Sequence, residues 1–255
     1  EETFQWIPLT EDTLSENDGD SGQYASYYEV CKEYQKKYGE GKIAEKPGII
    51  EGTHEVLEGL CVAELLDFNG DGDMELLIGY AGGDTDFSET GYCYEVWAWK
   101  NGQVEKVLMQ PANHIEGVAW IETTAEDTRT YMVKDQRMEN GAGSAEYLEY
   151  DGESFDTRYD IIVSQPELGE AGSLNGSAAT DEEITQLHNK LARPYCPEAA
   201  GDLYVNYCNE DGRRFFPLNT DGHVPTGTEE HQDLQRVLLN TEQTLQTVNA
   251  NRNEG

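Results

Sequence analysis

The amino-acid sequence predicts an α+β fold, in which a mainly antiparallel sheet follows one helix and precedes two more. Short apolar segments are joined by the turn pairs Asn101-Gly102 and Asp151-Gly152, which favour antiparallel hairpins. Apolar residues at three- and four-residue spacing near the N-terminus predict a helix. Thr180 and Thr226 each stand three residues before a glutamate, a pattern that begins helices. We therefore expect two helices late in the chain.

The first helix is expected over residues 23–38, after a polar, glycine-containing stretch at 1–22 that is typical of a flexible arm. Gly39 and Gly41 end this helix. Its three- and four-residue spacing places one stripe of side chains on a common face. The stripe consists of Tyr24, Tyr27, Tyr28, Cys31, Tyr34 and Tyr38. We interpret it as a core-packing face.

Strands are expected where β-branched and aromatic residues gather between turns. They follow one another at short intervals, which favours antiparallel neighbours. The expected strands cover residues 60–66, 75–80, 92–99, 103–108, 118–121, 130–133 and 146–150, with a further strand beginning at 154.

The last third of the chain is expected to hold less sheet. Residues 165–179 are rich in Pro, Gly, Ser and Ala and predict a loop. A short helix follows Thr180, a late hairpin crosses Asp211-Gly212, and a final helix begins at Thr226. We expect a single domain over residues 23–250, and a frayed tail at 251–255.

The charge balance restricts the partners of the chain. There are 51 acidic residues against 17 basic ones, a formal net charge of −34. Phosphate binding needs clustered Lys and Arg, so nucleic acid and anionic membrane surfaces are excluded as expected partners. No run of 18 apolar residues occurs, so no transmembrane segment is expected.

The five cysteines contain no Cys-x-x-Cys pair, which argues against a zinc or redox site. Cys31, Cys61 and Cys93 lie in apolar stretches and are expected to be buried. Cys196 and Cys208 flank a short segment, and the sequence leaves open whether they form a disulfide.

One acidic loop carries the clearest chemical pattern. Counted from Asp67, oxygen-bearing side chains occupy positions one, three and five, a glycine occupies position six, and position nine is a glutamate. Calcium prefers six to eight oxygen ligands, which alternate residues on a tight loop can deliver. The candidate metal ligands are Asp67, Asn69, Asp71, Asp73 and Glu75. Ile78 occupies position twelve, where an EF-hand needs glutamate, so this is not an EF-hand.

The loop resembles the shorter calcium-binding loops of FG-GAP and VCBS-type repeats, which join two strands and place their last carboxylate at position nine. The resemblance implies a bound Ca²⁺ at residues 67–75. A propeller would need several such loops, and the sequence contains one. The alternative is an acidic hairpin turn without an ion.

The order of helix, acidic loop and aromatic hairpins also resembles uncharacterised secreted lipoprotein-like domains of gut Firmicutes. This resemblance implies export and a lipid anchor upstream of residue 1. We therefore expect a calcium-stabilised binding domain, extracellular or anchored at the cell surface, that is not an enzyme and whose glycan or protein ligand is unknown.

Two other functions are compatible with the sequence. The first is a calcium-dependent surface hydrolase acting on glycan or peptide, for which His114 and His223 are the candidate bases. No nucleophile elbow and no His-Glu-x-x-His motif support it, and no catalytic residue is assigned. The second is a carbohydrate-binding module that stacks sugars on Trp97 and Trp99, which share one face of the strand at 92–99.

Overall fold

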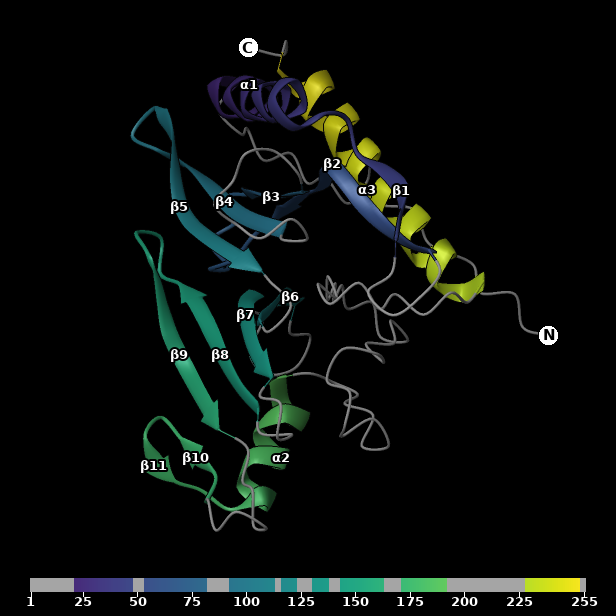
Figure 1. Ribbon diagram of the computed structural model, residues 1–255. Coiled ribbons are helices and arrows are strands. Elements are labelled where there is room, and N and C mark those ends of the chain that lie inside the picture. Colours follow the sequence, from purple (N-terminus) through teal and green to yellow (C-terminus); the bar gives the residue numbers. More distant parts are fainter. Residues whose placement is uncertain are drawn as a thin grey trace, which may run out of the picture.

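The fold is α+β, as the sequence predicts: the computed structural model contains two antiparallel sheets and three helices within the residues that it describes (Figure 1). The two sheets lie one beyond the other along the molecule, and one helix precedes them in the chain while two follow. The described residues are 21–47, 53–81, 92–112, 116–122, 130–137, 143–162, 171–191 and 228–252.

The first sheet is a meander in which each strand pairs with the next one in the chain, in the order β1-β2-β3-β4-β5. Its strands are β1 (Lys42–Pro47), β2 (Thr53–Leu66), β3 (Glu75–Ala81), β4 (Tyr92–Lys100) and β5 (Gln103–Ala112). The sequence predicts β3, β4 and β5 closely, but it does not predict β1 or the first half of β2. Asn101 and Gly102 both adopt positive φ, of 51° and 82°, which suits the tight β4–β5 hairpin.

The second sheet continues the meander in the order β11-β10-β9-β8-β7-β6. Its strands are β6 (Glu116–Glu122), β7 (Thr130–Arg137), β8 (Gly143–Tyr150), β9 (Phe155–Ile162), β10 (Ser173–Leu174) and β11 (Ser177–Ala178). The short β10–β11 hairpin falls inside the stretch expected to be a loop. Its turn residues Asn175 and Gly176 have φ of 51° and 74°, so an Asn-Gly turn closes this hairpin as well.

The three helices are α1 (Ser21–Tyr38), α2 (Asp181–Leu191) and α3 (Thr228–Asn251). Thr180 begins α2 as predicted, because its hydroxyl accepts the Glu183 N–H at 3.2 Å while the Glu183 carboxylate accepts the Thr180 N–H at 2.8 Å. The expected helix start at Thr226 and the late hairpin across Asp211-Gly212 lie outside the described residues.

Both ends of the described chain are more ordered than expected. Ser21 and Gly22, expected in the arm, form the first turn of α1, which is fixed because Gln23 donates to the Met74 carbonyl at 2.9 Å. Asn251, expected to fray, ends α3, and the Arg252 guanidinium lies 4.0 Å from the centre of the Tyr28 ring. Residues 1–20 and 253–255 lie outside the described part.

One core lies between α1 and the first sheet. The tyrosine stripe of α1 packs there, which confirms the core-packing interpretation: Tyr27 and Cys31 are buried, and the other stripe tyrosines pack around them. The sheet contributes the buried side chains Leu60, Leu76, Ile78, Tyr80 and Cys93, and α3 contributes Val248. Cys31, Cys61 and Cys93 are buried free thiols, as predicted, and burial raises the pKa of Cys31 and Cys61 to about 12.

A second core joins the two sheets. The opposite face of the first sheet supplies Leu77, Tyr94, Val96 and Ala98, the loop between β2 and β3 supplies Phe68, and the second sheet supplies Met132 and Tyr150. The alternation expected along residues 92–99 is therefore confirmed, because Tyr94 and Val96 lie in this core while Cys93 lies under α1. The far face of the second sheet packs against α2 through Tyr131, Tyr147, Ile161 and Ile184.

Candidate metal centre

The acidic loop connects two antiparallel strands that the sequence predicts to flank it. β2 ends at Leu66 and β3 begins at Glu75, and these two residues are direct partners across the ladder. Gly70 and Gly72 have φ of 77° and 94°, a left-handed backbone that glycine adopts without strain. The two glycines thus allow the chain to reverse tightly between β2 and β3.

Asp67 organises the interior of the loop. Its Oδ1 accepts the Gly70 N–H at 2.7 Å and the Asp71 N–H at 3.2 Å, and its Oδ2 accepts the Gly72 N–H at 2.9 Å. The Asp67 side chain is thereby held over the turn, at the centre of the predicted ligand set.

Asn69 and Asp71 point toward each other beside Asp67. The Asn69 amide donates to Asp71 Oδ2 at 2.7 Å, and Asn69 Oδ1 accepts the Asp71 N–H at 3.2 Å. Asp71 Oδ1 in turn accepts the Asp73 N–H at 2.8 Å, while Asp73 itself is exposed. Three of the five predicted ligands are therefore linked directly in one network, and Asp73 lies at its outer edge.

Glu75 forms the buried base of the loop. Glu75 is only 4% exposed, and its Oε2 accepts the Phe68 N–H at 3.0 Å. Burial raises the pKa of Glu75 to about 8, the Phe68 N–H opposes the rise, and the nearby charges of Asp71, Asp67 and Asp73 add to it. Among the described residues, no Lys or Arg forms an ion pair with Glu75. The loop thus buries a carboxyl group beside three other acids without a neutralising side chain.

The chemistry of this donor set fits a hard cation, because every predicted ligand supplies oxygen and none supplies sulfur or imidazole nitrogen. In the conformation seen here, most of these oxygens accept backbone N–H groups of the loop. No group of three or more Asp, Glu, His or Cys side chains in the described ranges is arranged to hold a metal ion. The assignment of Asp67, Asn69, Asp71, Asp73 and Glu75 as ligands therefore stays a prediction.

Residues far away in the sequence support the loop, and sequence analysis did not single them out for that role. Tyr27 and Gln23 on α1 both donate to the Met74 carbonyl at 2.9 Å. Thr130 on β7 donates its hydroxyl to the Asp67 carbonyl and its N–H to the Phe68 carbonyl, each at 3.3 Å. Such partners carry no local sequence signal, because only the tertiary fold brings them to the loop.

A second cluster of polar side chains surrounds the buried Glu95 on β4, the strand that also carries Trp97 and Trp99. Glu95 on β4 is 1% exposed and accepts hydrogen bonds from Tyr34 at 2.5 Å, Tyr80 at 3.0 Å and Lys106 at 3.1 Å. The cluster therefore joins α1 to β3, β4 and β5. The Glu95 carboxylate accepts hydrogen bonds from all three donors, and the bond from Tyr34 holds α1 on the sheet.

Trp97 lies next to this cluster. The carbohydrate-binding alternative expects Trp97 to be exposed beside Trp99 and to stack on sugars. The Trp97 ring meets that of Tyr34 edge-on at 6.3 Å, and the Lys106 ammonium lies 5.4 Å from its centre. Its indole Nε1 is buried. Helix α1 and Lys106 thus occupy the surroundings of the Trp97 ring.

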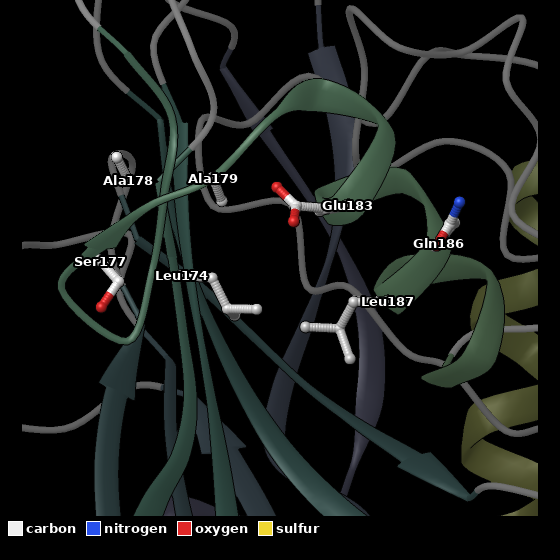
Figure 2. Close-up of a pocket in the computed structure, with 7 residues that line it drawn as sticks. All are labelled: Leu174, Ser177, Ala178, Ala179, Glu183, Gln186 and Leu187. Atoms are coloured by element: carbon white, nitrogen blue, oxygen red, sulfur yellow. The ribbon is translucent and has the colours of Figure 1, made fainter.

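A concavity of about 410 Å³ lies between the β10–β11 hairpin and α2 (Figure 2). Leu174 and Leu187 point into it from opposite sides. The carboxylate on its rim, Glu183, is committed to the cap of α2, where it also accepts the Thr180 hydroxyl at 2.9 Å. The concavity is lined by four apolar residues together with Ser177, Glu183 and Gln186, and Gln186 donates to Glu182 at 3.3 Å.

Several sequence-based candidates fall outside the described residues, among them His114, His223, Cys196 and Cys208. Within the ranges that are described, no helix combines the length and apolar character needed to cross a membrane.

No family model, curated protein or solved structure matches this chain. The resemblance of residues 67–75 to a calcium loop thus rests on the residues of the loop themselves.

Proposed function

We propose that this chain is a calcium-stabilised binding domain that acts outside the cell or on its surface and is not an enzyme. One observation carries the calcium part of the proposal: buried Glu75 lies beside Asp67, Asp71 and Asp73 without a cationic partner among the described residues. A divalent cation would neutralise this repulsion and would accept oxygen ligands from the same loop. Extracellular calcium is abundant enough to fill sites of modest affinity.

The interaction part of the proposal rests on composition and on the resemblance of the loop. A net charge of −34 favours solubility and attraction of cations. The ligand of the domain is expected to be a glycan or a protein on a surface, and calcium is expected to stabilise the fold that presents the binding face.

Melting of the protein in calcium and in chelator tests the proposal. An ion that binds the folded state alone stabilises it by mass action. For a site with a dissociation constant of about 10⁻⁴–10⁻³ M, about 10 mM calcium should contribute roughly 1.4–2.7 kcal/mol, or a rise of roughly 3–10 °C in melting temperature. Equal melting temperatures in calcium and chelator would refute the calcium site.

The variant Asp71→Ala locates the ion. It removes a carboxylate from the centre of the loop network while leaving both flanking strands intact, so the fold should survive and the response to calcium should vanish. Glu242→Ala on α3 is the matched control, because it removes one exposed carboxylate outside the loop and should retain the full response. An undiminished response in Asp71→Ala would place the ion elsewhere.

A further inference from the structure

The dipeptide Asn-Gly occurs four times in the chain, and three copies lie between strands in the part that the structure describes. They are Asn69-Gly70 in the acidic loop, Asn101-Gly102 between β4 and β5, and Asn175-Gly176 between β10 and β11. Glycine has no side chain to shield its backbone nitrogen, which can attack the side-chain amide of the preceding asparagine. The hydrogen bonds around each pair therefore control how readily the two groups meet.

Asn69-Gly70 is held on both sides of such a reaction. The attacking group, the Gly70 N–H, donates to Asp67 Oδ1 at 2.7 Å. The attacked group, the Asn69 amide, donates to Asp71 Oδ2 at 2.7 Å and accepts the Asp71 N–H at 3.2 Å. Both groups must leave their partners before they can react, so the fold protects this pair.

Asn175-Gly176 is held on one side. The Asn175 side chain accepts the Asp160 N–H at 2.8 Å and donates to the Arg158 carbonyl at 3.5 Å. The Gly176 N–H forms no hydrogen bond with the residues that the structure describes. The fold thus protects the attacked amide of this pair but not the attacking nitrogen.

Asn101-Gly102 is exposed and lacks both restraints. Neither the Asn101 amide nor the Gly102 N–H forms a hydrogen bond within the described ranges. The two residues make up the whole turn, because Lys100 and Gln103 are direct partners across the β4–β5 ladder. The side chain and the nitrogen are therefore free to meet without loss of a hydrogen bond of their own.

We propose that Asn101-Gly102 is a site of spontaneous modification, at which the asparagine converts to aspartate and isoaspartate. The Gly102 nitrogen forms a bond to Asn101 Cγ, the Cγ–Nδ2 bond breaks, and the Gly102 proton leaves with Nδ2 as ammonia. Water then opens the five-membered imide at either of its carbonyl carbons. Opening at Cγ gives aspartate, and opening at the main-chain carbonyl gives isoaspartate, whose backbone runs through Cβ and Cγ. The net change replaces ammonia by water and transfers no electrons.

Isoaspartate alters the β4–β5 turn, because it adds one backbone atom to a two-residue turn in which both residues have positive φ. The neighbouring Lys100 side chain is only 12% exposed and connects the two sheets. Its Nζ donates to the Glu153 carbonyl at 2.6 Å and to the Glu153 carboxylate at 3.3 Å, in the turn between β8 and β9. Modification therefore weakens a contact between the sheets and adds a negative charge beside it.

Peptide mapping by mass spectrometry tests the proposal on the full chain, kept in mildly alkaline buffer with chelator at physiological temperature. In the folded chain, products should build up at Asn101 at least about fivefold faster than at Asn69 or Asn175, because loss of one hydrogen bond costs about that factor. In concentrated urea, the three sites should react at similar rates, since each carries the same dipeptide. Equal ratios of folded to unfolded rate at the three sites would overturn the proposal.

Two variants test the chemistry and its cause. Asn101→Gly removes the reacting amide and keeps a residue that adopts positive φ without strain, so modification of this turn should cease. Asp67→Ala removes the acceptor of the Gly70 N–H, so the rate at Asn69 should rise at least about fivefold. An unchanged rate at Asn69 in this variant would contradict control by hydrogen bonding.

Thermal melting before and after incubation tests the consequence for the sheets. The melting temperature of the unaltered chain should fall as isoaspartate accumulates at position 101, while that of Asn101→Gly should hold. Asn175→Gly is the matched control, because it removes the amide of a protected pair at a residue that also has positive φ. It should age as the unaltered chain does. An equal fall in Asn101→Gly would overturn the effect on the contact between the sheets.

Discussion

Among the acids of the loop, Glu75 differs by its burial. Removal from water disfavours its charged form, and the surrounding carboxylates disfavour it further. The same charge reaches two buried tyrosines: the pKa values of Tyr27 and Tyr150 are raised chiefly by burial, and also by Glu75. Without a cation, burial and the neighbouring carboxylates thus both oppose ionisation of Glu75.

This arrangement predicts a pH dependence in calcium-free solution. The pKa of Glu75 is raised from 4.5 to about 8 on folding, so the folded state holds a proton that the unfolded chain releases. The free energy of unfolding should therefore fall as the pH rises from about 5 to 8, by an amount of the order of a few kcal/mol. In the variant Glu75→Gln, this contribution to the decrease in the free energy of unfolding should be absent.

Denaturant unfolding at several pH values, in chelator, measures the effect. The groups that face Glu75 are Asp67, Asp71, Asp73, Tyr27 and Tyr150, and all are retained in the Gln variant. The difference between the two proteins therefore isolates Glu75. Parallel pH profiles for the variant and the unaltered chain would contradict the prediction.

At the scale of elements, α1 is attached to the first sheet by polar contacts as well as by apolar packing. Tyr34 reaches Glu95 on β4, and the ring of Tyr38 stacks on Tyr80 of β3 at 4.3 Å. Hydrogen bonds to a buried charge are stronger than neutral ones, so these contacts define one position for α1.

Tyr34→Phe is therefore expected to loosen α1. The change removes one donor to buried Glu95, which keeps Tyr80 and Lys106. The free energy of unfolding should fall by about 1–3 kcal/mol, measured by denaturant titration. Tyr28→Phe is the control: its hydroxyl bonds to none of the described residues, and its ring keeps the contact with Arg252. Equal stabilities for the two variants would argue against the role of Glu95.

The elements that sequence analysis predicted best are those with local signals. The stripe of α1, the Asn101-Gly102 hairpin and the Thr180 cap depend on residues within a few positions of one another. The separation into two sheets has no such signal, because the same alternating pattern suits either. The β10–β11 hairpin escaped prediction because its strands have two residues each, although Asn175-Gly176 marked its turn.

The same distinction applies to the candidate site. The hydrogen bonds that link Asp67, Asn69 and Asp71 are local, because they join residues within four positions of one another. The burial of Glu75 depends on α1 and the second sheet, and the Thr130 contact spans 63 positions of the chain. Residue spacing therefore indicates an oxygen-rich loop but not the distant contacts that hold it in place, and the assignment of the metal ligands stays a prediction.

For the whole molecule, a net charge of −34 over 255 residues implies strong self-repulsion in the folded state. Salt screens this repulsion, with a Debye length of about 10 Å at 0.1 M and about 3 Å at 1 M. Two contributions to calcium stabilisation must therefore be separated, namely general screening and specific binding in the loop.

We expect the melting temperature to rise as sodium chloride increases from about 0.05 to 0.5 M, because screening weakens the repulsion between acids. At fixed ionic strength, calcium should add a further rise that sodium does not reproduce. Thermal melting across both series checks this expectation. A calcium effect equal to that of sodium at matched ionic strength would mean that screening alone acts.

Thr241 on α3 completes the backbone bonding of β2. A register shift between Leu60 and Val62 interrupts the ladder with β3, and the Thr241 hydroxyl accepts the Ala63 N–H at 3.2 Å and donates to the Cys61 carbonyl at 2.8 Å. These bonds span 178 and 180 positions of the chain. Because these bonds join residues so distant in sequence, β2 cannot complete its backbone bonding until α3 has been synthesised. A net charge of −34 favours repulsion between partly folded copies of the chain during that interval.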